Sequence, residues 1–274
     1  MSLVNIKKVN LFTLYLVIAF LAFVVPGYGQ DSEKAELVTD RPDQTESATI
    51  VPKGSVQLET GMLFTSDSYD FSGTKVTNTS FSLPNNLFRI GVHERIELRV
   101  MFLEFGKVNS KVGSTSSELG KGLSPLAIGT KIKFFEENGF LPETAILAHT
   151  TLPLGGADFK PEKMGYDFRF SMAHTLSDNL ALGYNVGAEF EYDALNSEYV
   201  SSGVYTLSLG IGITDKFGVY TEFFGDFAKS HEFDAGITYL INPMTQFDLS
   251  GGVGLTDEAN DYYLSTGITV RLFN

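Results

Sequence analysis

Residues 180–192, LALGYNVGAEFEY, show the pattern from which the fold is predicted. Counting from Leu180, every second residue is apolar or aromatic, and counting from Ala181, every second residue is small, polar or charged. Side chains alternate across a β-strand, so the stretch predicts a strand with one apolar and one polar face. Such a strand fits a soluble sheet with its apolar face on a core. It equally fits a transmembrane barrel strand with its apolar face in lipid and its polar face on a lumen.

The same alternation returns along most of the chain and predicts about twelve strands. They are expected near residues 55–66, 76–92, 95–105, 123–135, 140–152, 166–176, 180–192, 199–214, 217–227, 232–241, 246–255 and 262–273. The connections between them are alternately long and short, and the first and last are both long. Among the long ones, residues 67–75 and the Ser/Gly/Lys-rich residues 106–122 are expected to be loops.

This alternation of loop lengths distinguishes the two kinds of sheet. Transmembrane barrels have short periplasmic turns, longer outer loops and an even number of strands, and a tilted spanning strand has about 10 residues. A soluble sandwich has no reason to place all its long loops at one end. The predicted fold class is therefore all-β, an antiparallel up-and-down transmembrane β-barrel of about twelve strands with short periplasmic turns and longer outer loops.

The N-terminus resembles a secretory signal. Lys7 and Lys8 form a basic segment, an uncharged apolar run follows over residues 11–25, and small residues stand at Gly27 and Gly29. The rival interpretation, an uncleaved anchor, is disfavoured because the run is shorter than the ~20 residues of a spanning helix. We expect a cleaved signal peptide over residues 1–29, a polar N-terminal arm over 30–54 and a barrel over 55–274. Export to a Gram-negative type of outer membrane follows, with outer-membrane lipid and the barrel-assembly machinery as partners.

Composition disfavours several function classes. The net charge of −13 argues against nucleic acid as a partner, because phosphate binding needs a basic surface. The absence of cysteine removes disulfides, thiolate metal sites and cysteine nucleophiles. The histidines are expected to be turn or strand-face residues, since none has metal-ligand spacing; they are His93, His149, His174 and His231. We expect no enzyme, no metal and no cofactor. An outer-membrane lipid hydrolase, which needs a serine and a histidine in hydrogen-bond reach, is the less favoured alternative.

Three stretches carry a resemblance to a known family. They are residues 39–47, TDRPDQTES, residues 51–61, VPKGSVQLETG, and residues 87–99, LFRIGVHERIELR. Together they resemble the outer-membrane family labelled "putative meta-pathway of phenol degradation", whose members are often described simply as transporters. The resemblance extends from about Leu37 to the C-terminus and includes the arm motif Asp40, Arg41 and Pro42. It implies a barrel with a transport role, and it brings neither catalytic residues nor a named solute.

The polar faces of the strands supply candidate lumen-lining residues. From the first half of the chain these are Glu97, Arg99, Lys131, Lys133, Asp167 and Arg169; from the second half they are Asn185, Glu189, Glu191, Glu222, Asp226, Asp234 and Asp248. Sequential strands are neighbours in a meander, so cations should gather on one wall and carboxylates on the other. One interpretation is a set of cross-strand pairs inside a narrow barrel. The other is a transverse field across a small pore that favours polar or cationic solutes.

Barrel size limits the predicted function. Eight strands enclose an interior filled by side chains and sixteen or more enclose a water channel, so twelve predict partial filling. The arm either folds into the lumen, where Arg41 would meet the acidic wall, or lies in the periplasm. The prediction is a passive transporter or channel for a small-molecule solute, aromatic and hydrophobic ones included. The alternative is a structural or surface-interaction barrel with a plugged lumen.

Overall fold

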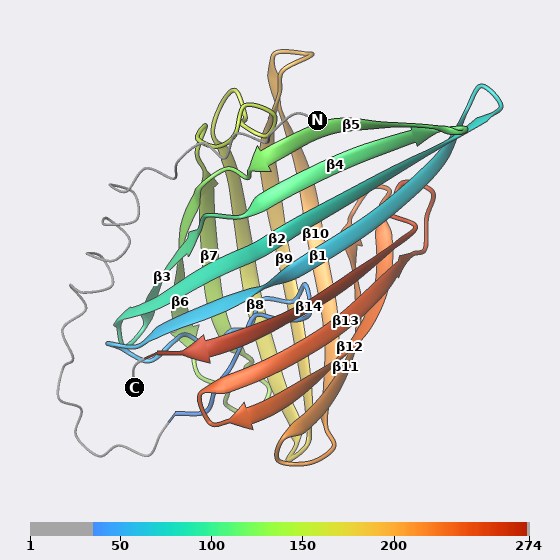
Figure 1. Cartoon of the computed structure of the whole chain (residues 1–274). Helices are drawn as coiled ribbons and strands as arrows, with labels where there is room; N and C mark the ends of the chain where they lie inside the picture. Colours follow the sequence, from blue (N-terminus) through green and yellow to red (C-terminus); the bar gives the residue numbers. More distant parts are fainter. Residues whose placement is uncertain (1–34, 273–274) are drawn as a thin grey trace, which may run out of the picture. The chain divides into compact units, whose positions relative to one another are not determined.

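The computed structural model describes residues 35–272, which contain fourteen β-strands (Figure 1). The strands are β1 (Val56–Phe71), β2 (Thr74–His93), β3 (Ile96–Met101), β4 (Phe105–Val112), β5 (Thr115–Leu123), β6 (Ala127–Phe135), β7 (Glu143–Thr151), β8 (Gly165–Ser177), β9 (Leu180–Asp193), β10 (Glu198–Gly212), β11 (Phe217–Asp226), β12 (His231–Asn242), β13 (Thr245–Gly254) and β14 (Tyr262–Arg271). Over the same range, no helix has the length and apolarity needed to span a membrane. The expected signal peptide lies outside the described residues.

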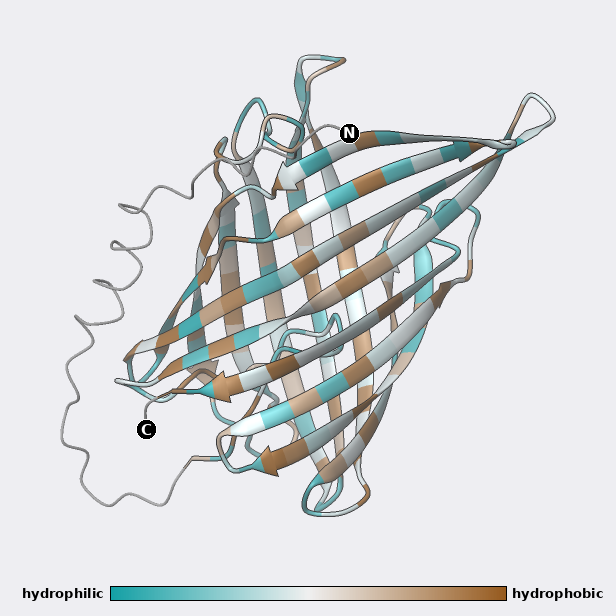
Figure 2. Cartoon of the chain, in the orientation of Figure 1, coloured by the Kyte–Doolittle hydropathy of each residue, from teal (hydrophilic) through white to brown (hydrophobic). Residues whose placement is uncertain are grey.

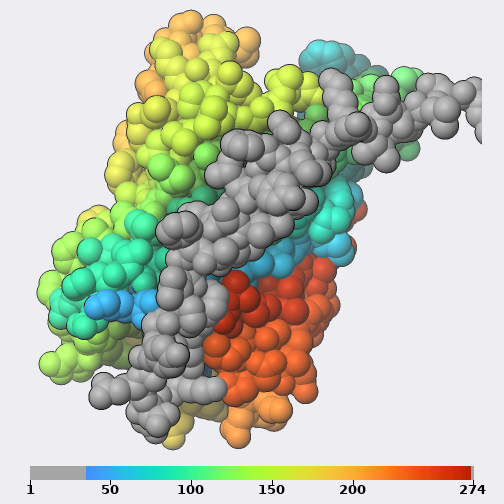
Figure 3. Space-filling model, turned by 60° about the vertical axis from the view of Figure 1, so that its left-hand side comes forward, coloured from blue at the N-terminus to red at the C-terminus, as the bar shows by residue number. Residues whose placement is uncertain are grey.

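The strands form one closed antiparallel sheet. β1 pairs with β2 on one side and with β14 on the other, through ten residue pairs from Gln57–Arg271 to Ser66–Tyr262. In Figure 3 the red surface of β14 borders the blue surface of β1. β3 and β4 are two parts of one interrupted strand, as are β5 and β6, so the ring contains twelve strands. The prediction of an antiparallel barrel of about twelve strands is confirmed.

The two interruptions lie side by side. Leu103, between β3 and β4, has a left-handed φ of 58°, and Gly122, near the end of β5, has a φ of 153°. Beyond them β4 continues along β2 and β5 continues along β4, but no strand within residues 35–272 pairs with the outer edge of β5. The loop 152–164 lies along part of this edge, where the Gly156 amide donates to the Leu123 carbonyl at 2.8 Å.

The expectation of loops at residues 67–75 and 106–122 is wrong. Both segments are hairpins with two-residue turns, at Ser72-Gly73 and Gly113-Ser114. Ser72 and Gly73 have φ values of 52° and 79°, the positive pair that a tight hairpin turn requires. These strand ends carry few apolar side chains, so the apolar–polar alternation from which strands were predicted is missing there. Backbone pairing forms the strands without it.

The outside of the barrel is apolar and its inside is polar. On β9, Val186 is 45% exposed whereas its neighbour Asn185, on the opposite face, is 2% exposed. Figure 2 shows the same alternation of hydrophobic and hydrophilic residues along the strands. The largest fully buried side chains include Arg89, Arg99 and Lys131. This arrangement is the reverse of a soluble sandwich and is typical of a barrel whose outer face meets lipid.

The connections divide the barrel into two ends. One end carries the residues flanking the barrel strands, before Val56 and after Arg271, together with connections 94–95, 136–142, 178–179, 213–216 and 243–244; we call it the turn end. The other, the loop end, carries connections 72–73, 113–114, 152–164, 194–197, 227–230 and 255–261. In outer-membrane barrels the first strand typically begins, and the last strand ends, at the end that carries the short turns. That end faces the periplasm.

Candidate channel lumen

The described part of the N-terminal arm, residues 35–54, enters the barrel from the turn end (Figure 1). It is tied to the wall from its first residues. Arg271 of β14 donates to the carbonyls of Ala35 at 2.8 Å and Glu36 at 3.0 Å. Gln57 of β1 donates from its side-chain amide to the Val38 carbonyl at 2.9 Å. The arm therefore occupies space inside the ring of strands.

A glycine on β2 allows the root of the arm to fold back. The Gly54 amide donates to the Gly91 carbonyl at 2.7 Å, and the Gly91 amide donates to the Ser55 carbonyl at 3.0 Å. A Cβ atom on Gly91 would lie 2.1 Å from the Pro52 carbonyl oxygen and 2.4 Å from that of Val51. Any side chain at position 91 would thus collide with the backbone of the arm.

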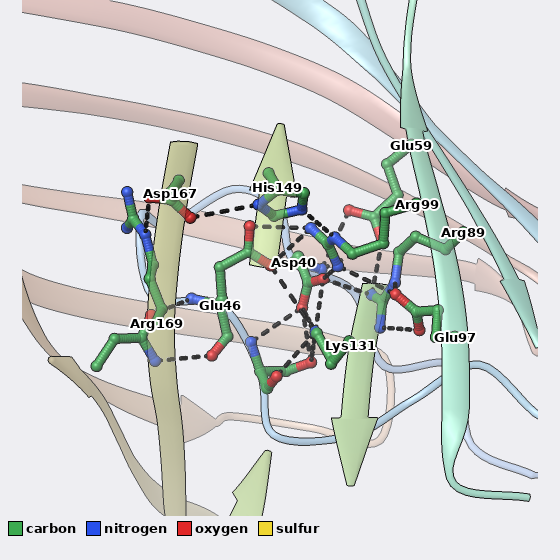
Figure 4. Close-up of polar contacts among 12 residues, drawn as sticks. Asp40, Glu46, Glu59, Arg89, Glu97, Arg99, Lys131, His149, Asp167 and Arg169 are labelled. Atoms are coloured by element: carbon green, nitrogen blue, oxygen red, sulfur yellow. Dashed lines mark hydrogen bonds and ion pairs between the residues drawn. The ribbon is translucent and has the colours of Figure 1, made fainter. Parts of the chain in front are cut away.

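Asp40 of the arm is the centre of a buried ion cluster (Figure 4). Its Oδ2 atom lies 3.1 Å from Arg89 Nη1, 2.5 Å from Arg99 Nη1 and 2.9 Å from Lys131 Nζ. Its Oδ1 atom accepts bonds from the amide and the hydroxyl of Ser47, which closes the arm into a compact loop. Burial alone would raise the pKa of Asp40, but Arg89, Lys131 and Arg99 together hold that pKa well below its usual range.

Two wall carboxylates complete the neutralisation of these cations. Glu97 lies 2.9 Å from Arg89 Nε and 3.0 Å from Arg99 Nη1, and Glu59 lies 2.9 Å from Arg89 Nη1. Glu97 also accepts the Val51 amide of the arm at 2.8 Å. Removing one partner of a buried ion pair costs roughly 3–5 kcal/mol, because the other charge stays buried and unpaired. The arm is consequently a structural part of the charged interior.

A second series of contacts runs from this cluster along the inner face of the barrel, from strand to strand (Figure 4). Arg99 Nε donates to His149 Nε2 at 2.9 Å, so the proton of the neutral imidazole lies on Nδ1, which is 3.3 Å from Asp167. Arg169 then joins Asp167 at 3.0 Å to Glu189 at 2.7 Å. This series links β3, β7, β8 and β9 on the inner face.

The arm also contacts the acidic wall built by β11, β12 and β13. Arg41 Nη2 lies 3.0 Å from Asp248 and 2.9 Å from Ser265 Oγ. Arg41 fits there because Gly61 and Gly267 present no side chain; Cβ atoms on them would lie 2.7 Å and 2.4 Å from the guanidinium group.

Glu222 receives two donors from the arm. The Gln44 amide donates at 2.7 Å, and the Thr45 hydroxyl donates to the other carboxylate oxygen. Thr45 also bonds Thr206 of β10 at 2.7 Å. The arm is thus bonded to opposite sides of the lumen.

Asp234 on β12 has a different environment from the paired carboxylates. Tyr220 donates to its Oδ2 atom at 3.2 Å and Tyr263 donates to the same atom, whereas Oδ1 is buried without a hydrogen-bond partner. Among the residues that the structure describes, neither Asp234 nor Glu222 has a cation within ion-pair distance. No group of histidine, aspartate and glutamate residues within 35–272 is arranged to hold a metal ion.

Most of the lumen candidates point inward. The buried ones are Glu97, Arg99, Lys131, Asn185, Glu222, Asp234 and Asp248, and the partly buried ones are Lys133, Asp167, Arg169 and Glu189. Asn185 bonds the arm at Glu46, and Lys133 pairs with Glu136 and Glu143 at the turn end. Glu191 is exposed near the loop end of β9.

Asp226, also predicted to line the lumen, lies at the loop end of β11 and binds its own turn. Its side chain accepts the amides of Ala228, Lys229 and Ser230 at distances of 2.7, 2.5 and 3.1 Å and thereby holds the 226–231 turn. Asp226 has the same parity as the inward-facing residues of β11, but its carboxylate accepts hydrogen bonds from backbone amides of the adjacent turn.

Several interior residues were not among the predicted lumen residues. Glu59 and Arg89 do lie on the polar parity of their strands, so strand alternation could have identified them. Glu46 of the arm, which lies 2.8 Å from Arg99 Nη2, could not be placed from the sequence, because the arm has no periodicity. His149 lies between Arg99 and Asp167, and the consecutive apolar residues 145–148 before it do not indicate which face of the strand points inward.

Comparison with known proteins gives one family and several structural similarities. A family model described as "Putative MetA-pathway of phenol degradation" matches residues 39–272. The COG4313 outer membrane channel from Pseudomonas putida F1 has a TM-score of 0.62 at 14% identity, covering 86% of this chain and 100% of that chain. The translocator domain of the autotransporter NalP from Neisseria meningitidis has a TM-score of 0.51 at 11% identity, covering 80% and 88%. Comparison with curated proteins gives no match. At these identities the structural similarities show an outer-membrane type of barrel fold.

Proposed function

Because the chain belongs to the family described as "Putative MetA-pathway of phenol degradation", we propose that it is an outer-membrane channel for passive passage of small solutes. The observation that carries this proposal is the inverted distribution of polarity, in which Arg99, Lys131 and Glu222 line the inside of a barrel with an apolar outer face. A barrel that served only as a scaffold could fill its interior with apolar side chains at lower desolvation cost. Charged groups on the inner wall favour water and polar solutes along it.

The arm is expected to limit the size of the solutes that can pass through the lumen. Its contacts with β2, β3 and β6 on one side and with β11 and β13 on the other narrow the lumen near Asp40 and Glu222. Only small molecules are expected to pass. The family description names phenol degradation, so small aromatic compounds join small polar solutes as the first compounds to test. Glu191, which is exposed near the loop end, and the net charge of −13 favour cationic over anionic solutes.

Reconstitution in liposomes tests the proposal. Liposomes containing the folded barrel should swell in isotonic solutions of small polar solutes several times faster than liposomes containing heat-unfolded protein. Swelling should decline as solute size increases, because the arm restricts the lumen. If no solute enters and planar bilayers carry no current, the channel proposal is wrong.

Charge reversal at the loop end should change ion selectivity. Replacing Glu189 and Glu191 by lysine places two cations near the outer entrance of the lumen and turns the attraction between position 189 and Arg169 into repulsion. We expect the reversal potential in a tenfold KCl gradient to shift toward anion preference. The matched control replaces Glu258, an exposed residue of the 255–261 loop, and Glu162 by lysine. Equal shifts in both variants would mean that Glu189 and Glu191 do not line the path.

Two alternatives make different predictions. A plugged structural barrel, which the buried contacts of Asp40 favour, would leave solute uptake unchanged in a deletion strain while envelope integrity declines.

The lipid-hydrolase alternative gains no support from the histidines. In residues 35–272 their rings contact arginine, aspartate, glutamate or tyrosine side chains, or a backbone amide, and none contacts a serine hydroxyl.

A further inference from the structure

The sheet extends beyond the barrel interruptions as a four-stranded flap. We define the flap as residues 67–71 of β1, 74–82 of β2, 105–112 of β4 and 115–123 of β5. It projects toward the loop end, at the upper right of Figure 1. Its outward face continues the apolar outside of the barrel: Phe105 pairs with Leu123 on this face, and both are more than 40% exposed.

On the same outward face, lysines occupy the positions two residues beyond these apolar residues on β4 and β5. Lys107 pairs directly with Lys121 across β4 and β5, two residues beyond the Phe105–Leu123 pair. Lys111 follows further along β4, and Lys75 lies on β2 near the hairpin tip. A step of two residues is about 7 Å along a strand, so Lys107 and Lys121 border the apolar surface, and Phe81 of β2 lies directly opposite Lys107.

The four lysines of this face exceed its two carboxylates, Glu118 and Asp70, of which Asp70 lies directly opposite Lys75. Glu118 alone serves both Lys107, at 3.2 Å, and Lys121, at 2.7 Å. Within residues 35–272, Lys75 and Lys111 form no ion pair. Like charges directly opposite each other on a sheet are destabilising unless an anion joins them. The flap thus carries a concentrated positive surface on a protein whose net charge is −13.

We propose that this face of the flap binds the phosphate groups of an anionic glycolipid in the outer leaflet. The proposal rests on the proposed outer-membrane location. Lysine side chains extend from an apolar surface toward the headgroup layer, so Lys107, Lys111 and Lys121 present their ammonium groups at the depth of lipid phosphates. A membrane lipid also explains why the lysines adjoin exposed Phe105 and Leu123, which a soluble phosphate would not contact.

Glu118 has a specific role in this arrangement. In the absence of lipid its carboxylate satisfies Lys107 and Lys121 together. A bound phosphate competes with this carboxylate for the same two ammonium groups. Removal of the Glu118 charge should therefore tighten lipid binding, whereas removal of the lysine charges should weaken it.

Titration of the purified full-length barrel with diphosphoryl lipid A in detergent, followed by native mass spectrometry, tests the proposal. Near an anionic surface each lysine contributes about a fivefold factor in affinity. The combined variant K107Q/K111Q/K121Q should bind lipid A at least tenfold more weakly than the unchanged protein. E118Q should bind it more tightly.

The matched control removes three exposed lysines away from the flap, in K53Q/K216Q/K229Q, and should leave binding within twofold. Unchanged binding in K107Q/K111Q/K121Q, or an equal loss in the control, would overturn the proposal. Displacement of lipid A by millimolar inorganic phosphate would also overturn it, because the ligand would then be free phosphate. Heat-modifiable migration on a gel verifies that each variant is folded. The titration uses no transported solute, so its failure is distinguishable from failure of the channel proposal.

Discussion

Substitution of Asp40 by alanine is expected to loosen the arm and enlarge the conducting path. The Asp40 carboxylate contacts Arg89, Arg99 and Lys131, and all three cations are buried. Without it each of the three cations loses one carboxylate partner, and Lys131 keeps only Glu46, at 3.8 Å. The loss of a partner to buried charge costs roughly 3–5 kcal/mol. Part of this cost is relieved when water enters the lumen and the arm moves away.

Single-channel current and unfolding by denaturant measure the two effects of Asp40→Ala. We expect conductance to rise at least twofold and the free energy of unfolding to fall. The matched control is Asp178→Ala, which removes an exposed carboxylate from the 178–179 turn and should change neither quantity. Unchanged conductance and stability in Asp40→Ala would mean that the ion cluster does not hold the arm.

Gly91→Ala is expected to displace the root of the arm by steric conflict alone. The added methyl group would lie 2.1 Å from the Pro52 carbonyl oxygen and 2.4 Å from that of Val51, so the arm backbone must shift. Overpacking of this kind typically costs about 1–3 kcal/mol. The same alanine at Gly210, which also lies on a strand but has its nearest neighbour 4.0 Å away, is the matched control.

The absence of cysteine from the chain provides a clean reporter for this shift. Ala48 of the arm is 1% exposed, so an Ala48→Cys thiol should react slowly with a water-soluble maleimide when the arm is seated. Gly91→Ala should accelerate labelling at least tenfold, and Gly210→Ala should not. Equal labelling rates in the two variants would contradict the proposed seat of the arm against β2.

Most barrel strands could be predicted because the apolar and polar residues of such a strand alternate in the sequence itself. On β9 the alternation from Leu180 to Tyr192 indicates which residues face outward and which face inward, without any knowledge of partners. In the flap, residues 67–75 and 106–122 were not predicted as strands because they lack apolar side chains at most positions, as Ser116 and Ser117 illustrate. Its hairpins depend on backbone pairing and on the turn at Ser72-Gly73.

The contacts of the arm could not be predicted for a different reason. Arg41 reaches Asp248, 207 residues away, and no period in residues 35–54 indicates which wall each side chain meets. Strand parity identifies a face, but it does not choose between a lumen and a local turn. Asp226 has the inward parity and still binds the amides of its own loop.

The current carried by single molecules of the intact barrel across a planar lipid bilayer tests whether the protein is a channel. Preparations that show heat-modifiable migration should give small discrete steps with a preference for cations. Asp40→Ala under the same conditions should give larger steps. Folded preparations of both proteins that carry no current would contradict the channel proposal and favour a plugged, structural barrel.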